Sequence, residues 1–221
     1  LVALVALLAT LAACGGSSEA PQSTQSATAA AAGGQKIDPA TTGDLKGTVV
    51  LNGPAPANAP VRMNADPMCA RSARGPQFQE TYKVAADGKS IGNVFVYVKD
   101  GLGTYAYDQP GEPMTLNQEG CQYIPHVLGI RVGQPLEIVN SDSTLHNVHG
   151  VPKANQEFNQ GQPIQGMKTT HTFTEKEADV VVPFKCDVHG WMNAFAGVLD
   201  PALGLQQFPL QCSGAPTLRC D

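Results

Sequence analysis

The sequence predicts an all-β fold, and three features support this prediction. The 221 residues include 23 Gly and 17 Pro, which interrupt regular structure at short intervals. No long stretch places apolar residues at the helical period, whereas several short runs rich in Val, Ile, Thr and aromatic residues are bounded by turn signals. With 42% hydrophobic and 15% charged residues, the chain has enough apolar material for one core. We therefore expect short strands joined by many turns.

The first half contains three segments with strand composition. Residues 46–51 are followed by a break rich in Asn, Gly and Pro. Residues 81–84 and 93–98 flank an Asp-Gly turn at residues 87–88, which predicts a hairpin. The segment 61–75 has no such pattern, and we expect it to be irregular.

The second half continues this pattern after a loop rich in Gly, Tyr and Pro. Short strands are expected at residues 121–126, 127–132, 135–140, 169–174, 179–184 and 193–199. Residues 151–168 are mostly polar and are expected to form a long loop. The pattern ends near residue 200, so residues 201–221 are expected to be an irregular tail.

The N-terminal segment resembles an export signal. Residues 1–13 form an apolar run that is too short to span a bilayer and has the length of the hydrophobic region of a secretory signal. Small residues precede Cys14, and Gly and Ser follow it, as in a bacterial lipobox whose Cys is acylated and becomes the mature N-terminus. An ordinary signal with an unrelated Cys is the alternative. The sequence starts at Leu1 without a Met or a basic region, so we expect further residues to precede it.

The remaining chain is expected to have three parts before the tail. Residues 14–44 are rich in Ser, Ala, Thr, Gln and Gly, which predicts a flexible linker between the lipid and the folded region. Residues 45–112 are expected to form an N-terminal β extension, and residues 113–200 the core. A separate small β-domain over residues 45–112 is the alternative. This organisation predicts a protein at the periplasmic or cell-surface face of a bacterial membrane, anchored by its lipid.

The six cysteines fit an exported protein. If Cys14 carries lipid and Cys186 binds a metal, an even number remains, namely Cys69, Cys121, Cys212 and Cys220. Three pairings are possible, and we favour Cys69 with Cys121 and Cys212 with Cys220. Free thiols in the tail are the alternative.

The charge pattern argues against nucleic acid as a partner. The net charge is −5, and the Lys and Arg residues are scattered along the sequence. A phosphate backbone is normally bound by a continuous basic surface, which this sequence does not predict. We expect a monomer whose partners are proteins and, through the lipid, a membrane.

Four side chains form a candidate metal site. Cys186, His189 and Met192 follow one another at even spacing, and His146 lies forty residues upstream in the run His-Asn-Val-His. Two imidazoles, a thiolate and a weak thioether are the ligand set of a copper ion that cycles between Cu(I) and Cu(II). Cys-x2-His-x2-Met between two expected strands is far more specific than any one of these residues alone.

Over about residues 113–199 the sequence resembles the cupredoxins, the small blue copper proteins. The short loop is most similar to that of the amicyanins, which also share the run His-Asn-Val-His. This resemblance implies a Greek-key β-sandwich that binds one type 1 copper ion. It also implies that His146, Cys186 and His189 are the trigonal ligands and Met192 is the long axial ligand.

The resemblance also gives roles to two neighbouring residues. Asn147 is expected to hydrogen-bond across to the Cys186 loop and to hold the sulfur in place. Asp187 stands where the family more often has Ser, Thr or Ala. Its carboxylate is expected to favour the more positive Cu(II) and to lower the reduction potential.

The loop between the last ligands is expected to face a redox partner. We expect the imidazole edge of His189 to be exposed to solvent, with Gly190 keeping the approach open and Trp191 forming part of a docking patch. A Trp191 that only shields the copper from water is the alternative.

Three further histidines are expected to lie outside the site. His149 is interpreted as a structural or surface residue, with ligation in place of His146 as the minor alternative. His126 is expected to be a core or hydrogen-bonded residue, and His171, in an alternating Thr-rich segment, to be solvated.

These residues predict an electron carrier and not an enzyme. Cys186 is flanked by Lys185 and Asp187, so the flanking His residues that connect to a second copper site in multicopper oxidases are missing. A second Cys four residues away, as in binuclear copper sites, is also missing. Copper sequestration or delivery is the first alternative. A structural zinc site is the weaker one, because Met is a poor zinc ligand.

Overall fold

The computed structural model describes residues 34–41, 47–73, 75–97, 105–106, 111–177 and 181–199. The signal segment 1–13, Cys14, Cys212, Cys220 and the tail 201–221 lie outside the described residues. Among the described helices, none has the length and apolar character needed to cross a membrane.

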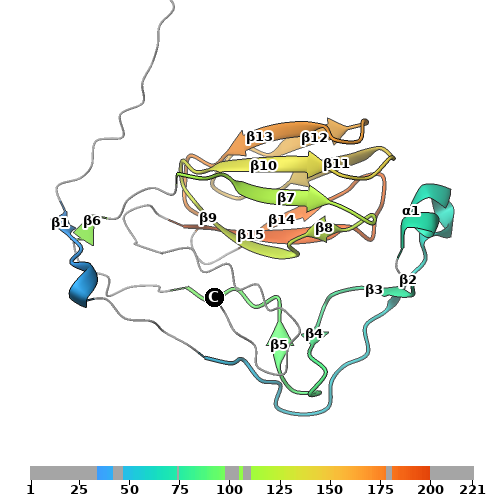
Figure 1. Ribbon diagram of the computed structural model, residues 1–221, viewed down its shortest axis with the longest axis horizontal. Coiled ribbons are helices and arrows are strands. Elements are labelled where there is room, and N and C mark those ends of the chain that lie inside the picture. Colours follow the sequence, from blue (N-terminus) through green and yellow to red (C-terminus); the bar gives the residue numbers. More distant parts are fainter. Residues whose placement is uncertain are drawn as a thin grey trace, which may run out of the picture. The chain divides into compact units, whose positions relative to one another are not determined.

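Two mixed sheets pack face to face (Figure 1). The four-stranded sheet has the order β13 (Lys168–Thr172), β10 (Pro135–Asn140), β7 (Met114–Gln118) and β8 (Tyr123–Ile124). The five-stranded sheet has the order β12 (Phe158–Gln162), β11 (His146–Gly150), β14 (Val182–Lys185), β15 (Asn193–Leu199) and β9 (Val127–Arg131). The chain passes from one sheet to the other after β8, β9, β10, β12 and β13. The predicted all-β sandwich is confirmed.

The core lies between the two sheets because apolar residues alternate along the central strands. In β10 every second residue is buried, and in β15 the small side chains of Ala194 and Ala196 are fully buried. Leu116, Leu136 and Ile138 of one sheet share a hydrophobic cluster with residues of the other. This cluster includes Leu128, Ile130, Val148, Phe184 and Val198, and it also contains Cys186 and Met192.

The N-terminal part is built from short pieces. They are β1 (Gln35–Lys36), η1 (Pro39–Thr41), β2 (Pro60–Val61), η2 (Met63–Ala65), α1 (Pro67–Ser72), β3 (Gln77–Phe78), β4 (Lys83–Val84), β5 (Ile91–Gly92) and β6 (Tyr105–Ala106). The strands form three two-residue ladders, β1 with β6, β2 with β3 and β4 with β5. Residues 61–75 were expected to be irregular, but they include the helix α1.

Two predicted strands of the first half are wrong. Among residues 47–51 the structure has only an isolated bridge between Val50 and Ser90. The predicted hairpin exists, but its second strand is β5 and not the segment 93–98. That segment contacts the sandwich through a side chain instead. A Cβ on Gly197 of β15 would overlap the ring of Phe95, and a Cβ on Gly129 of β9 would lie only 3.0 Å from it, so these two glycines make room for the ring.

The second half follows the prediction more closely. Strands β8, β9, β10, β13, β14 and β15 fall within or beside the predicted segments. The long loop predicted for residues 151–168 is wrong, because residues 158–162 form the edge strand β12.

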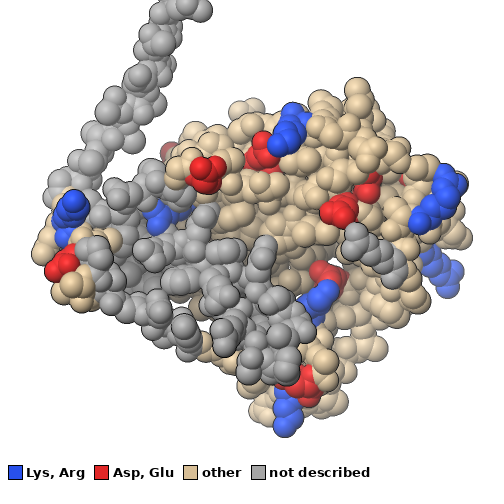
Figure 2. Space-filling view, viewed as in Figure 1, with Lys and Arg blue, Asp and Glu red and all other residues tan. Residues whose placement is uncertain are grey.

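Charges of both signs are interspersed over the face in Figure 2, and no large patch of one sign is visible there.

Candidate metal centre

Two segments meet at one end of the five-stranded sheet. β14 ends at Lys185 and β15 begins at Asn193, so residues 186–192 form the loop between them. β11 begins at His146 and runs antiparallel to β14, with His149 opposite Lys185. This register places the start of β11 beside Cys186. Hydrogen bonds from Met192 N to His189 O (2.8 Å) and from Cys186 N to Met192 O (3.2 Å) close the loop.

The predicted ligands converge in the interior of the protein. Ligand atoms of His146, Cys186 and His189 all lie within 4.8 Å of one another. The two Nδ1 atoms are 3.0 Å apart, and Cys186 Sγ is 3.8 Å from Nδ1 of His189. All three side chains are buried, as is Met192, which is 2% exposed. The structure thus gathers two nitrogens and a free thiol around one point.

The Cys186 thiol is prepared for ionisation. Burial raises its pKa, but hydrogen bonds from His146 and from backbone N–H groups of both segments outweigh this effect and lower the pKa to about 6. A metal binds the thiolate form of cysteine, so a lowered pKa favours binding near neutral pH. The N–H of His189 also points to the sulfur, at an N···S distance of 3.4 Å.

Asn147 bridges the two segments as expected. Its Oδ1 accepts a hydrogen bond from Asp187 N (2.8 Å) and lies 3.3 Å from Cys186 Sγ. The Tyr123 hydroxyl donates to the Asn147 carbonyl, and burial raises the pKa of this phenol, so the hydroxyl keeps its proton. β11 and the Cys186 loop are therefore connected directly at the sulfur.

The outer nitrogen of His146 is bound to Asp142, a residue that sequence analysis did not single out. Nε2 of His146 lies 2.9 Å from Asp142 Oδ2. The carboxylate also accepts hydrogen bonds from Gly120 N and Cys121 N, each at 2.8 Å. Burial raises the pKa of Asp142, but these hydrogen bonds outweigh it and lower the pKa. Asp142 is therefore an anion at neutral pH.

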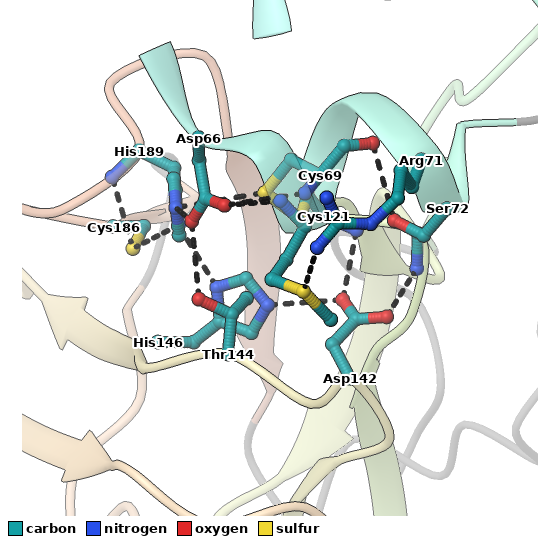
Figure 3. Close-up of a disulfide and its surroundings, with 12 residues drawn as sticks. Asp66, Cys69, Arg71, Ser72, Cys121, Asp142, Thr144, His146, Cys186 and His189 are labelled. Atoms are coloured by element: carbon teal, nitrogen blue, oxygen red, sulfur yellow. Dashed lines mark hydrogen bonds and ion pairs between the residues drawn. A yellow bond between two sulfur atoms is a disulfide. The ribbon is translucent and has the colours of Figure 1, made fainter. Parts of the chain in front are cut away.

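The outer nitrogen of His189 is bound to Asp66, from the N-terminal part of the chain. Nε2 of His189 lies 2.9 Å from Asp66 Oδ2 and 3.5 Å from Cys69 Sγ (Figure 3). His189 is only 1% exposed. The expected solvent-exposed imidazole edge is therefore wrong, because the start of α1 covers it.

Helix α1 is held in this place by a cap and a covalent bond. Asp66 is its N-cap, with Oδ1 accepting from Met68 N (2.7 Å) and Cys69 N (3.3 Å), and Pro67 occupies the first helical position. Cys69 forms a disulfide with Cys121, as predicted. This bond fastens α1 to the turn that follows β7 (Figure 3).

Trp191 packs against the same region. Its Nε1 donates to the Cys121 carbonyl (3.1 Å), and its ring centroid is 5.1 Å from that of His189. The half-buried indole thus covers one side of the imidazole, which is the geometry of the shielding alternative. Gly190 is exposed, and no atom lies within 4 Å of the position that a Cβ there would take.

Asp187 lies at the surface in a charged group and not at the metal position. Its carboxylate accepts hydrogen bonds from Asn147 Nδ2 (3.1 Å) and Asn159 Nδ2 (2.7 Å). His149 lies between Asp187, at 3.0 Å from Nδ1, and Glu157, at 2.6 Å from Nε2. Both of its nitrogens point to carboxylates, which agrees with a structural role.

The prediction for His126 is confirmed, whereas that for His171 is not. His126 is largely buried and packs edge-on against Phe195, in agreement with the prediction. His171 was expected to be solvated, and this is wrong. It stacks on Phe158 at a centroid distance of 3.7 Å, and burial lowers its pKa.

Sequence reasoning missed Asp66 and Asp142. Asp66 precedes Pro67, which is a recognisable helix start, so the N-cap could have been predicted. Its contact with His189 joins residues 123 positions apart, and no local signal predicts such a contact. Asp142 lies four residues before His146, on the segment already assigned to the site.

Three solved structures of copper proteins are similar to part of the chain. A Cu-containing nitrite reductase from Thermus scotoductus SA-01 is 22% identical, with a TM-score of 0.37, over 47% of this chain and 25% of that one. A purple cupredoxin from Nitrosopumilus maritimus is 23% identical, with a TM-score of 0.33, over 39% and 99%. A Cu(I) form of an amicyanin variant is 21% identical, with a TM-score of 0.34, over 39% and 82%. No protein-family model and no curated protein matches the sequence.

Proposed function

We propose that this protein is an electron carrier with one type 1 copper ion, which His146, Cys186 and His189 would hold, with Met192 as a further, weak ligand. The observation that carries this proposal is the convergence of two Nδ1 atoms and a thiol sulfur within 4.8 Å of one another in the buried interior. Copper bound to such a donor set changes between Cu(I) and Cu(II). No bond of a substrate is made or broken, so we propose a carrier and not an enzyme.

The side chains around the ligands fit this role. The thiol of Cys186 has a pKa of about 6, and the outer nitrogen of each imidazole already has a carboxylate partner. The Nδ1 atoms of both imidazoles therefore face the position that a metal would take, and an Nδ1 proton held toward the other ring or toward Cys186 would leave when a metal binds. Burial of the ligands excludes water and limits rearrangement of the protein.

Copper delivery and structural zinc binding are less well supported. A delivery site has to release its ion, whereas α1, its disulfide and Trp191 cover His189 here. Zinc binds well to Cys and His, but the fourth candidate ligand is the thioether of Met192, which zinc binds poorly.

The proposed cellular setting is a bacterial membrane surface. We propose that Cys14 carries the lipid and that redox partner proteins dock near Gly190 and Trp191. The exposed Gly190 leaves this side of the loop open, whereas α1 covers the outer edge of His189. Incorporation of labelled fatty acid in cells, abolished by Cys14→Ala, tests the anchor.

The absorption spectrum of the oxidised, copper-loaded protein tests the function. We expect an intense thiolate-to-copper band in the visible range, which Cys186→Ser abolishes. We also expect reversible one-electron reduction with slow copper loss. A colourless protein that binds zinc tightly, or one that exchanges copper rapidly, would contradict the electron-carrier proposal.

A further inference from the structure

Both candidate imidazole ligands have the same arrangement. Nδ1 of each ring faces the point where the ligand atoms converge, and Nε2 of each ring lies 2.9 Å from a carboxylate oxygen. The carboxylates are Asp142 for His146 and Asp66 for His189. They come from different parts of the chain, one in the loop before β11 and one at the start of α1.

We propose that Asp66 and Asp142 are positioning residues that keep Nε2 of both imidazoles protonated, which makes Nδ1 the nitrogen that would bind copper, and that shift the bound copper toward its Cu(II) form. This inference rests on the proposed function of the site. Each carboxylate accepts the Nε2–H of its ring, so the proton cannot move to Nδ1 without loss of this hydrogen bond. Nδ1 is thereby the nitrogen that each ring can offer to a metal, once any proton on it has left.

The surroundings of Asp66 require a carboxylate that only accepts hydrogen bonds. Its carboxylate takes hydrogen bonds from two backbone N–H groups of α1, from the Thr144 hydroxyl (3.0 Å) and from His189. Thr144 lies on the loop that leads to His146, so Asp66 connects both ligand segments (Figure 3). An amide in this place would face at least one donor with its own NH2 group.

Asp142 has an equivalent set of partners. It accepts from two consecutive N–H groups, those of Gly120 and Cys121, in addition to His146. Its own N–H donates to Asn140 Oδ1 (2.9 Å), which holds the loop in place. Cys121 and Gly120 both have a positive φ, 56° and 64°, and this backbone turn is what points the two N–H groups to one carboxylate.

The disulfide connects the two pairs. Cys69 lies three residues after Asp66 in α1, and Cys121 donates its N–H to Asp142. The disulfide therefore joins the helix that begins after Asp66 to the turn whose N–H groups bind Asp142. Two negative charges beside the outer edges of the ligands stabilise the state of the ion with the higher positive charge.

The test uses Asp66→Asn and Asp142→Asn in the full chain, with Glu137→Gln as the control. Glu137 is a surface carboxylate paired with Lys168 on β10 and β13, away from the ligands. Nitrogen NMR of the metal-free protein reports the tautomer of each imidazole. We expect Nε2 to be protonated on both rings in the wild type and in the control, and a population with unprotonated Nε2 to appear for His189 in Asp66→Asn and for His146 in Asp142→Asn.

Electrochemistry of the copper-loaded proteins gives the second reading. We expect each Asp→Asn variant to lose about tenfold or more of its preference for Cu(II) over Cu(I), which corresponds to a rise in reduction potential of about 59 mV per tenfold for one electron. Unchanged tautomers and an unchanged potential in Asp66→Asn would overturn the inference. If Asp142→Asn does not fold, Asp66→Asn alone decides. Because the NMR experiment contains no metal, it separates failure of this inference from failure to bind copper.

Discussion

The sandwich and the N-terminal part contribute to the same site in different ways. The sandwich supplies the four candidate ligands from two neighbouring segments, β11 and the loop between β14 and β15. The N-terminal part supplies Asp66 and a disulfide that lie over His189. The ligands can be recognised from their spacing in the sequence, whereas the cover depends on contacts between residues more than 100 positions apart. The identity of the candidate ligands can thus be read from short sequence motifs, whereas the burial of His189 depends on long-range contacts.

The largest loss of stability is expected from removal of the disulfide between Cys69 and Cys121. Replacement of Cys69 and Cys121 by Ser should lower the free energy of unfolding by about 2–5 kcal/mol, since the bond constrains a long loop in the unfolded chain. Loosening of α1 should also uncover His189 and accelerate electron exchange with a small inorganic oxidant.

Chemical denaturation and stopped-flow kinetics measure these two effects. Glu137→Gln, which keeps the disulfide and the core, is the control for stability. A double variant with unchanged stability and unchanged exchange rate would show that α1 does not control access to the site.

The next largest loss of stability is expected where the segment 93–97 contacts the sheet. In Gly197→Ala the new Cβ would overlap the ring of Phe95, so we expect a loss of stability of about 1–3 kcal/mol. The loss should largely disappear in a Phe95→Ala background, which a double-mutant cycle measures. Additive effects would mean that Phe95 does not lie against β15.

A smaller change in stability is expected when the pH is lowered. The hydrogen bond from His189, together with those from Met68, Thr144 and Cys69, lowers the pKa of Asp66 from 3.8 to about 2 despite the opposing effect of burial. A carboxyl with a lowered folded pKa adds stability above its ordinary pKa, and this contribution is lost as the pH falls from about 4 through 2. Asp66→Asn should therefore flatten the stability profile of the metal-free protein in this range. Equal slopes for wild type and variant would contradict the assignment.

The smallest effect is expected from Asp187. Its side chain is 42% exposed and already has Asn147, Asn159 and His149 as partners, so solvent and neighbours screen its charge. Asp187→Ala should raise the reduction potential, but by less than Asp66→Asn. A larger rise for Asp187→Ala, measured by voltammetry, would reverse the relative importance of the two carboxylates.

Particular residues show where sequence reasoning succeeds and where it fails. The alternation in β10 and the apolar run in β15 reflect burial between two sheets, and both strands were predicted. β12 was missed because an edge strand paired only with β11 does not need apolar residues at every second position. The segment 93–98 has the composition of a strand, but its described residues 93–97 form none, and Phe95 packs on two glycines of the sheet instead.

Some features of the candidate site were also predicted from the sequence, and others were missed. Cys-x2-His-x2-Met and the upstream His146 were identified from spacing, whereas counting cysteines left three pairings open, of which the favoured one contained the observed Cys69–Cys121 bond. His171 was assigned to solvent because its packing depends on Phe158, which belongs to the missed strand β12. The cover over His189 depends on an N-cap whose second partner lies 123 residues away.

The most direct test is a crystal structure of the copper-loaded protein with anomalous scattering at the copper edge. We predict one copper peak bound by Nδ1 of His146, Sγ of Cys186 and Nδ1 of His189, with both Nε2 atoms still on Asp142 and Asp66. A copper ion elsewhere, or one bound to Nε2 of His189 with α1 displaced, would contradict the proposed site and its cover.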